Sequence, residues 1–222
     1  GVHKLRPGEK LIVEHGVVRS ERYWQLTYRP DDAWTLDSAA EQYRELLADS
    51  IRLRRVSDVP LGAFLSGGVD STSVVGMLSD MSAAPVRTFT IGFDDAHADE
   101  LRYARIAARR FNTEHTEALL HPDMVEVASQ LIRHFGEPFA DSSAVPTWLV
   151  SRLAQKDVVV ALAGDGGDEL FAGYTWLHMT RRVEQYKRVP PAARRFMRTV
   201  LRAAPRAPFF EKLRRFEGDA AL

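Results

Sequence analysis

The segment DVVVALAG, at residues 157–164, constrains the fold of this chain more than any other part of its sequence. It is a continuous Val, Ala and Leu run, which is typical of a parallel strand that helices cover on both faces. Apolar runs at 59–66 and 86–93 also have the length and the bounding turn residues of buried strands. Segments with helical spacing separate these runs. The sequence therefore predicts an α/β domain with a parallel sheet flanked by helices.

The rest of the chain extends this alternation. Residues 10–28 contain two alternating stretches around Gly16 and predict a hairpin, which a polar linker follows. Ser38, with Glu41 three residues later, predicts a capping box at the start of a helix. Beyond Tyr174 the pattern is helical, with a break at Pro190–Pro191. We also expect helices at 71–81, 99–111, 122–134 and 145–156, and an extended segment at 113–119.

Charge and cysteine content exclude several classes of function. Lys and Arg together number 30, as do Asp and Glu, so net charge gives no reason to expect a nucleic-acid partner. Basic residues predominate after Arg181, where a solvated or covered helical surface is preferred to a nucleic-acid patch. The chain has no cysteine, which excludes disulfides and thiolate chemistry and fits a reducing compartment. No apolar run approaches the ~18 residues of a membrane span, so we expect a cytoplasmic protein without a membrane partner.

The segment SGGVDST, at residues 66–72, interrupts an apolar run with small and polar residues. It lies at the carboxyl end of a predicted strand and before a predicted helix, where ligands bind in open α/β sheets. Its glycines leave backbone amides open to an anion, its three hydroxyls are donors, and the helix N-terminus adds positive partial charge. Asp70 would repel a bare phosphate, so it predicts a cation, most naturally Mg²⁺. The alternative is a tight β–α turn with an aspartate cap.

A missing lysine narrows the chemistry of this loop. SGGVDST is not a Walker A loop, because no lysine follows the glycines to contact a transferring γ-phosphate. Nor does it match the dinucleotide pattern G-x-G-x-x-G. A loop of this kind suits a pyrophosphate that departs whole. We therefore expect cleavage between the α- and β-phosphates.

A second polar turn, GDGGDE at residues 164–169, follows the apolar run at 157–164. It brings Asp165, Asp168 and Glu169 together, which is unfavourable without cations or backbone donors. An exposed acidic turn is the alternative. Other polar and aromatic residues are interpreted as structural, with Glu100 suited to a helix N-terminus. The remaining members of this group are His115, His134, Glu137, Trp148 and Trp176.

These motifs resemble those of a known family. SGGVDST resembles the pyrophosphate loop of the ATP pyrophosphatase (PP-loop) superfamily, whose members adenylate a carboxylate or carbonyl oxygen. ALAGDGGDELFAGY, at 161–174, resembles the matching segment of glutamine-dependent asparagine synthetases and the related β-lactam synthetases. Four further segments match the same family in the same order, so the resemblance covers residues 56–178. They are FTIGFDD, DELRYAR, TEHTE and GEPFADSSAVPTWLVSRLA. The N-terminal segment resembles the end of a glutaminase domain.

The resemblance implies an adenine nucleotide α-hydrolase-like fold with ATP and Mg²⁺ as cofactors. It implies that Asp70 and Asp168 share Mg²⁺ bound to pyrophosphate, and that Asp70, Asp165 and Asp168 act in catalysis. Ala163 and Asp165 stand where the family often has serine and glutamate, so the identity of the substrate stays open. The implied nucleotide-binding residues are Leu65, Ser66, Gly67, Gly68, Val69, Asp70, Ser71, Thr72, Ile91, Ala163 and Gly164.

The implied activity is that of an ATP-dependent amide-forming ligase. A substrate carboxylate, with aspartate the first candidate, attacks the α-phosphorus of ATP, and ammonia from glutamine then displaces AMP to give an amide such as asparagine. The alternatives are a related amidotransferase, a β-lactam or peptide-cyclising synthetase, or an ATP-binding module without turnover. Residues 1–35 are expected to end a glutaminase-like domain with its linker, 36–190 to form the synthetase core and 191–222 to begin a C-terminal helical part. A glutaminase domain is expected upstream, and homodimer formation stays open.

Overall fold

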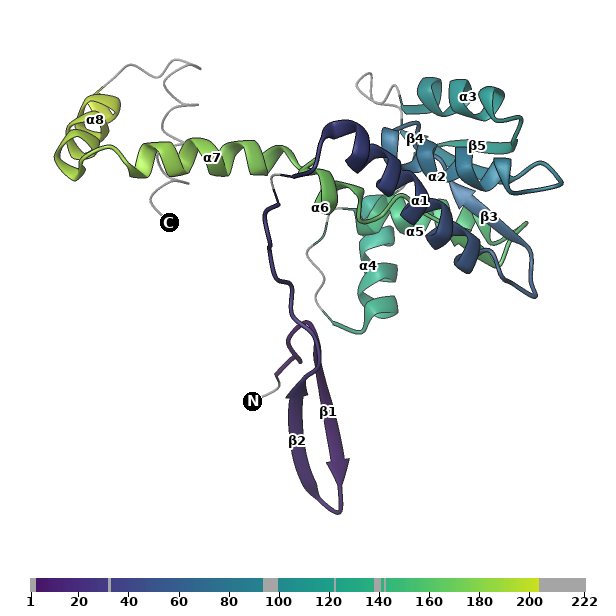
Figure 1. Cartoon of the computed structure of the whole chain (residues 1–222), viewed down its shortest axis with the longest axis horizontal. Helices are drawn as coiled ribbons and strands as arrows, with labels where there is room; N and C mark the ends of the chain where they lie inside the picture. The colour runs from purple at the N-terminus through teal and green to yellow at the C-terminus, as the bar shows by residue number, and fades with distance from the viewer. Residues whose placement is uncertain are drawn as a thin grey trace. The chain divides into compact units, whose positions relative to one another are not determined.

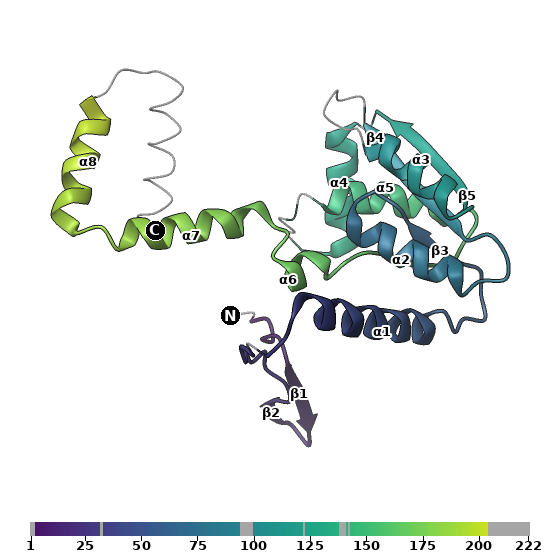
Figure 2. The same cartoon turned by 45° about the horizontal axis from the view of Figure 1, so that its top comes forward.

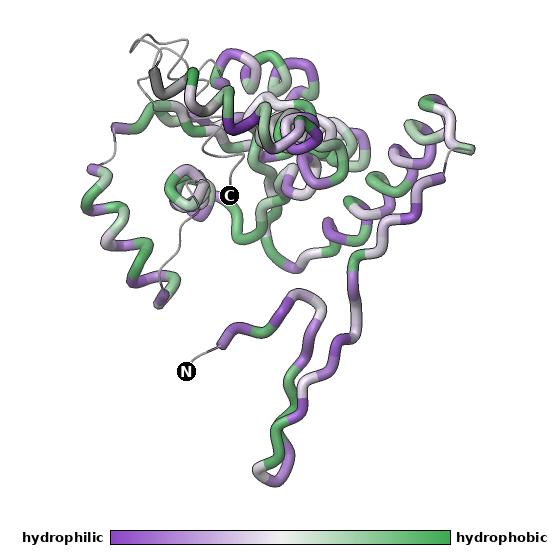
Figure 3. The backbone as a smooth tube through the Cα atoms, turned by 90° about the vertical axis from the view of Figure 1, so that its left-hand side faces the viewer, coloured by the Kyte–Doolittle hydropathy of each residue, from purple (hydrophilic) through white to green (hydrophobic). Residues whose placement is uncertain are grey.

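The computed structural model describes residues 3–31, 33–93, 100–121, 123–137, 141 and 143–203, which form two compact units, 1–47 and 48–222. The first unit contains the predicted hairpin, with β1 at Glu9–Glu14 and β2 at Val17–Arg22. His15 and Gly16 form its turn, and both have positive φ, as a two-residue hairpin turn requires. Apolar residues of the hairpin gather towards this turn (Figure 3).

The second unit is built on a four-stranded parallel sheet, which confirms the predicted fold class. Its strands follow the order β5-β4-β3-β6, and every neighbouring pair is parallel. Figure 1 labels β3, β4 and β5 of this sheet. From β3 the chain moves outwards to β4 and β5 and then returns to β6 on the other side of β3. The boundary between β3 and β6 is therefore the topological switch point, where ligands bind in sheets of this kind. The strands are β3 (Leu61–Phe64), β4 (Arg87–Phe93), β5 (Glu114–Leu120) and β6 (Val160–Leu162).

Helices cover both faces of this sheet. Right-handed crossovers put α2 (Val69–Asp80) and α3 (Glu100–Arg110) on one face. The return connection puts α4 (Met124–Phe135) and α5 (Ala144–Ala154) on the other, as Figure 2 shows. β4 accordingly contacts both α3 and α5. The other helices are α1 (Leu36–Arg54), α6 (Gly167–Phe171), α7 (Thr175–Lys187) and α8 (Pro191–Ala203).

The alternation of side chains along β4 divides the core between the two faces. Phe89 is almost fully buried and packs with Ala154 and Val158 on the α5 side. Thr88 and Thr90, one residue to either side of it, are buried as well. Because neighbouring side chains on a strand point to opposite faces, these two threonines belong to the α2 and α3 side. Thr90 also donates a hydrogen bond to the carbonyl of Leu65, directly before the loop at 66–72.

Two sequence expectations about element ends were wrong for local reasons. The cap of α1 is Thr35 rather than Ser38, because Thr35 has the same side-chain chemistry three residues earlier. Ser38 N donates to Thr35 Oγ1 at 3.2 Å, and Thr35 N donates to Ser38 Oγ at 3.0 Å. β6 is shorter than the apolar run at 157–164, because Asp157 N and Val158 N both donate to the Ala154 carbonyl and complete the end of α5.

Parts of the expected structure lie outside the described residues. These are 94–99, 138–140 and 142, which hold pieces of the quoted motifs, and 204–222, which hold most of the expected C-terminal part. The division of the chain at residues 35 and 190 into functional domains stays a prediction. Within the described ranges, no helix has both the length and the apolar content that crossing a membrane requires.

Candidate functional site

Two turns that are far apart in the sequence touch at the carboxyl edge of the sheet. One follows β3 and leads into α2, and the other follows β6 and leads into α6. A Cβ atom placed on Gly164 would lie 2.7 Å from the backbone nitrogen of Ser71 and 3.1 Å from Cβ of Asp70. Gly164 thus packs directly on the first turn of α2, at a distance that only glycine allows. The loop at 66–72 and the acidic turn at 164–169 form one surface.

The loop at 66–72 is organised by its own hydroxyl groups. Ser66 N donates to Ser71 Oγ at 3.2 Å, the two serine hydroxyls are 2.9 Å apart, and Gly68 N donates to Ser66 Oγ at 3.2 Å. Gly68 is the N-cap of α2 and supplies no side-chain hydrogen bond to its first amides. In the part of the chain that the structure describes, the buried Thr72 Oγ1 also has no partner. Uncapped amides and an unpartnered hydroxyl at a helix N-terminus are suited to an anion.

The shape of this loop depends on Gly67. Its φ is +80°, a left-handed conformation that side chains other than glycine rarely adopt. A Cβ atom there would also lie 2.6 Å from the carbonyl carbon of Tyr103 and would overlap the backbone nitrogen of Ala104. The loop is therefore seated on the backbone of α3. Gly67 is needed both for its torsion angle and for this close contact.

Asp70 points at the acidic turn. A Cβ atom on Gly167 would lie 2.6 Å from Oδ1 of Asp70 and 2.7 Å from Oδ2, so the carboxylate occupies the space beside this glycine. Asp168 follows directly, and its own carboxylate lies against Gly173. No ion pair joins Asp70, Asp165 or Asp168 to a basic side chain within the described ranges. These carboxylates are available to a ligand or a cation.

The carboxylates fit a magnesium ion that also binds phosphate. Among the described residues, no group of three or more His, Asp or Glu side chains forms a metal site of its own. Mg²⁺ is characteristically held by one or two carboxylates together with substrate phosphates and water. Asp70 beside the turn that carries Asp168 meets that description, because the phosphate-suited loop lies next to both.

A small cavity of about 150 Å³ lies beside the loop, next to residues that the family resemblance implies bind nucleotide. Leu65 and Ile91 both line it, together with Glu100 from α3 and Thr147 from α5. The Leu65 N–H donates to the Phe89 carbonyl at 3.0 Å, and the Leu65 carbonyl accepts from the Thr90 hydroxyl. Both backbone groups of Leu65 thus have partners in the chain. Because β4 continues past the end of β3, β3 supplies no ladder partner beside Ile91, which lines the cavity.

An acidic cavity of about 350 Å³ lies next to the first, and Thr147 lines both. Tyr174 donates a hydrogen bond to Glu169, which raises the pKa of Tyr174 to about 12 and lowers the pKa of Glu169. Asp141 accepts from the Ser143 N–H at 2.9 Å, and this bond lowers the pKa of Asp141. The lining residues are Asp141, Ser143, Thr147, Gly164, Asp165, Gly166, Asp168, Glu169 and Tyr174.

The sequence interpretation missed Asp141 and Tyr174 as site residues. Both lie within the quoted motifs GEPFADSSAVPTWLVSRLA and ALAGDGGDELFAGY, which was the available signal. Glu100, interpreted as a helix-dipole residue, also lines the smaller cavity. His115 lines neither of the two. Its Nδ1 lies 3.0 Å from Thr88 Oγ1, and burial lowers its pKa, which agrees with a structural role.

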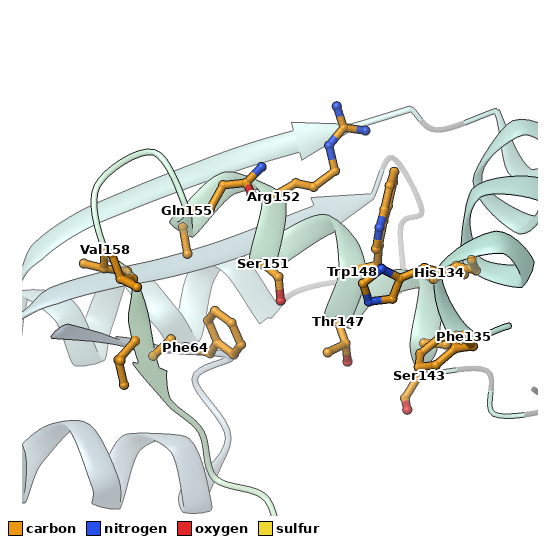
Figure 4. A pocket seen from close by; sticks show the side chains of 16 residues that line it. Phe64, His134, Phe135, Ser143, Thr147, Trp148, Ser151, Arg152, Gln155 and Val158 are labelled. Carbon is orange, nitrogen blue, oxygen red and sulfur yellow. The ribbon is translucent and has the colours of Figure 1, made fainter. Parts of the chain in front are cut away.

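A larger cavity lies elsewhere, between α4, α5 and β6 (Figure 4). It measures about 620 Å³, and its wall is mainly apolar, with Phe64 and Trp148 prominent. The Arg152 guanidinium lies 4.6 Å from the centroid of the Trp148 ring. None of the residues predicted to bind nucleotide or metal lines this cavity. Its size reflects an open apolar groove beside the outer strand, and the polar chemistry lies at the two smaller cavities.

The similarity of this chain to known proteins covers most of its sequence. A family model described as asparagine synthase matches residues 42–220. Over 202 residues the chain is 36% identical to a putative glutamine-hydrolyzing asparagine synthetase 2 from Methanocaldococcus jannaschii, covering 89% of this chain and 38% of that protein. Over 195 residues it is 30% identical to the amidase chyE of Penicillium rubens, covering 78% of this chain and 29% of that protein. The chain therefore spans about a third of the length of these relatives.

Among solved structures, the chain was matched to the NH3-dependent NAD synthetase from Campylobacter jejuni. The match has a TM-score of 0.41 and 16% sequence identity, and it covers 60% of each chain.

Proposed function

Because the chain belongs to the asparagine synthase family, we propose that it is the ATP-cleaving part of an amide-forming ligase. The observation that carries the proposal is the packing of Asp70 against Gly167, beside Asp168 and the uncapped start of α2. A phosphate loop alone would account for binding. Two carboxylates next to that loop, without basic partners in the described residues, additionally suit a metal-bound pyrophosphate leaving group.

In the proposed first step, a substrate carboxylate oxygen attacks the α-phosphorus of ATP. The bond from the α-phosphorus to the bridging oxygen breaks, and pyrophosphate leaves as the acyl-adenylate forms. Negative charge grows on the pyrophosphate during this step. The first amides of α2 are fixed donors that can stabilise this charge without reorganising.

Asp70 and Asp168 would hold Mg²⁺ against the phosphates, where the ion supplies Lewis-acid stabilisation. The adenosine would occupy the cavity beside Leu65 and Ile91, with the Ile91 backbone as the polar contact. This arrangement puts the α-phosphate between the adenosine cavity and the loop. The adjacent acidic cavity then faces the side from which a second substrate can approach.

In the proposed second step, ammonia attacks the acyl carbon and AMP departs. The incoming nitrogen must lose a proton, and a carboxylate at the edge of the acidic cavity can accept it. Asp165 is exposed there and is our candidate for this role. The same cavity suits a substrate with a cationic group, such as the ammonium of aspartate, because several carboxylates line it. Aspartate as substrate and glutamine as ammonia source are parts of the proposal.

A second candidate is a ligase that activates a different carboxylate. Two observations favour keeping it: Ala163 and Asp165 depart from the residues common in asparagine synthetases, and one relative carries the name of an amidase. Asp165 is one methylene shorter than the glutamate often found there, so the pocket has more room for substrate. The chemistry of the first step would be unchanged.

Exchange of labelled pyrophosphate into ATP tests both candidates in the full-length protein. Exchange that depends on aspartate alone supports asparagine synthesis, and exchange with another carboxylate supports the second candidate. Asp70→Asn should abolish exchange and weaken Mg·ATP binding in isothermal titration. Asp80→Asn, at the far end of the same helix, is the matched control and should leave both unchanged. Native-like exchange in Asp70→Asn would overturn the proposal.

A further inference from the structure

Thr90 is a buried polar residue of β4 that the proposed chemistry does not use. Its side chain is 3% exposed, and its hydroxyl donates to the backbone carbonyl of Leu65. A buried hydroxyl without a partner is destabilising, so this bond contributes to stability whatever else it does. The choice of partner is informative, because Leu65 is the residue directly before the loop at 66–72.

The bond from Thr90 fixes one side of a rigid unit. The Leu65 carbonyl and the Ser66 N–H belong to the same peptide group, which is planar and trans, so they point in opposite directions. Thr90 holds the carbonyl, and on the other side the Ser66 N–H donates to Ser71 Oγ at 3.2 Å. Rotation of this peptide would break both bonds. The peptide that begins the loop is thus clamped between β4 and α2.

The orientation of this peptide governs the rest of the loop. The last ladder bond between β3 and β4 runs from the Leu65 N–H to the Phe89 carbonyl, and the chain then leaves the sheet. Ser66 Oγ, which the peptide carries, bonds to both Ser71 Oγ and the Gly68 N–H. A turned peptide would displace this hydroxyl and the amides that follow it.

We propose that Thr90 is a positioning residue for pyrophosphate binding, acting through the Leu65–Ser66 peptide. The proposal rests on the proposed function, because it takes the loop at 66–72 to hold pyrophosphate. Thr90 also lines the adenosine cavity. Its effect on the two parts of ATP must therefore be measured separately, with Mg·pyrophosphate for the loop and adenosine for the cavity.

Isothermal titration of the full-length protein with these two probes gives the test. Thr90→Val keeps the shape and removes the hydroxyl, and should weaken Mg·pyrophosphate binding roughly tenfold, the loss expected for one hydrogen bond. Adenosine affinity should change little, since valine keeps the branched shape of the side chain that lines the cavity. Thr90→Ser restores the donor and should bind Mg·pyrophosphate within about threefold of the native protein.

Thr88→Val is the matched control. Thr88 lies on the same strand and face, is fully buried, and bonds through its hydroxyl to Thr113 and His115 rather than to the loop. It should lower the denaturation midpoint while leaving Mg·pyrophosphate affinity unchanged. The role of Thr90 would be overturned if Thr90→Val bound Mg·pyrophosphate as tightly as the native protein, or if Thr88→Val lost as much affinity as Thr90→Val. Either result would leave the proposed function standing. A native protein that binds neither Mg·pyrophosphate nor Mg·ATP would overturn the proposed function and this inference with it.

Discussion

Replacing Gly167 by alanine tests whether the contact between the two turns sets the position of the Asp70 carboxylate. The new Cβ would lie 2.6 Å from Oδ1 and 2.7 Å from Oδ2 of Asp70. Favourable contacts of carbon atoms lie near 3.5 Å or more, so the carboxylate must move by roughly 1 Å. A displacement of about 1 Å at a reacting centre can cost on the order of 100-fold in rate. We expect ATP–pyrophosphate exchange to fall by about that factor.

The stability of the same variant separates this cause from misfolding. Gly167 has no positive φ and is the first residue of α6, so alanine fits its backbone conformation and is the better helix former. The denaturation midpoint of Gly167→Ala should therefore stay level or rise while exchange falls. Exchange within about threefold of the native rate would refute the steric reasoning, because a clash of this size should change the rate by far more.

A double-mutant cycle locates the effect. If the alanine acts by displacing the Asp70 carboxylate, it should have little further effect in an Asp70→Ala background, where no carboxylate is present. Binding of Mg·ATP, measured by isothermal titration, gives the readout when exchange is too slow. A full additional loss in the double variant would show that Gly167→Ala acts on another part of the site.

Three further predictions concern ionisable groups. Burial lowers the pKa of His115 in the folded chain below 6.5. The contribution of neutral His115 to stability is therefore complete above that pH and is lost as the pH falls from 6.5 towards the folded pKa. When urea denaturation at about pH 7.5 is compared with that at about pH 5.5, His115→Asn should lose less stability between the two than the native chain does. Tyr174→Phe removes the donor that lowers the pKa of Glu169, and should move any acid limb of the exchange rate that depends on Glu169 to higher pH. Asp165→Asn should retain exchange but slow amide formation by about 100-fold or more, measured as product per ATP consumed; loss of exchange as well would contradict a role in the second step alone.

The sequence predicted the parallel sheet because β3, β4 and β6 fall within the apolar runs at 59–66, 86–93 and 157–164, and the prediction needed no distant contact. It also indicated both polar turns, since each follows such a run. It could not indicate which glycine of GDGGDE lies against the Asp70 carboxylate, because that depends on how β6 lies beside β3. The resemblance also implied Leu65 as a nucleotide-binding residue, while the bond from Thr90 to its carbonyl is visible only in three dimensions.

Asp141 and Tyr174 were missed for a related reason. Each lies in a segment whose match to the family was recognised, but neither stands next to a glycine-rich turn that would mark it chemically. They become site residues because α5 begins near the acidic turn and Tyr174 folds back onto Glu169. Ser38 shows a different error, because the N-cap rule was applied three residues after the actual cap, Thr35.

The length of β6 has a consequence for the dynamics of the site. This strand has three residues, and in the described part of the chain it pairs only with β3, so its opening frees little other structure. Local opening of this kind would carry Gly164 and Gly167 away from Asp70 while β3, β4 and β5 stay folded. A ligand bridging the two turns would hold the strand closed in proportion to its concentration and affinity. Slowed hydrogen exchange at the amides of β6 would then report occupancy of a site that none of those amides touches.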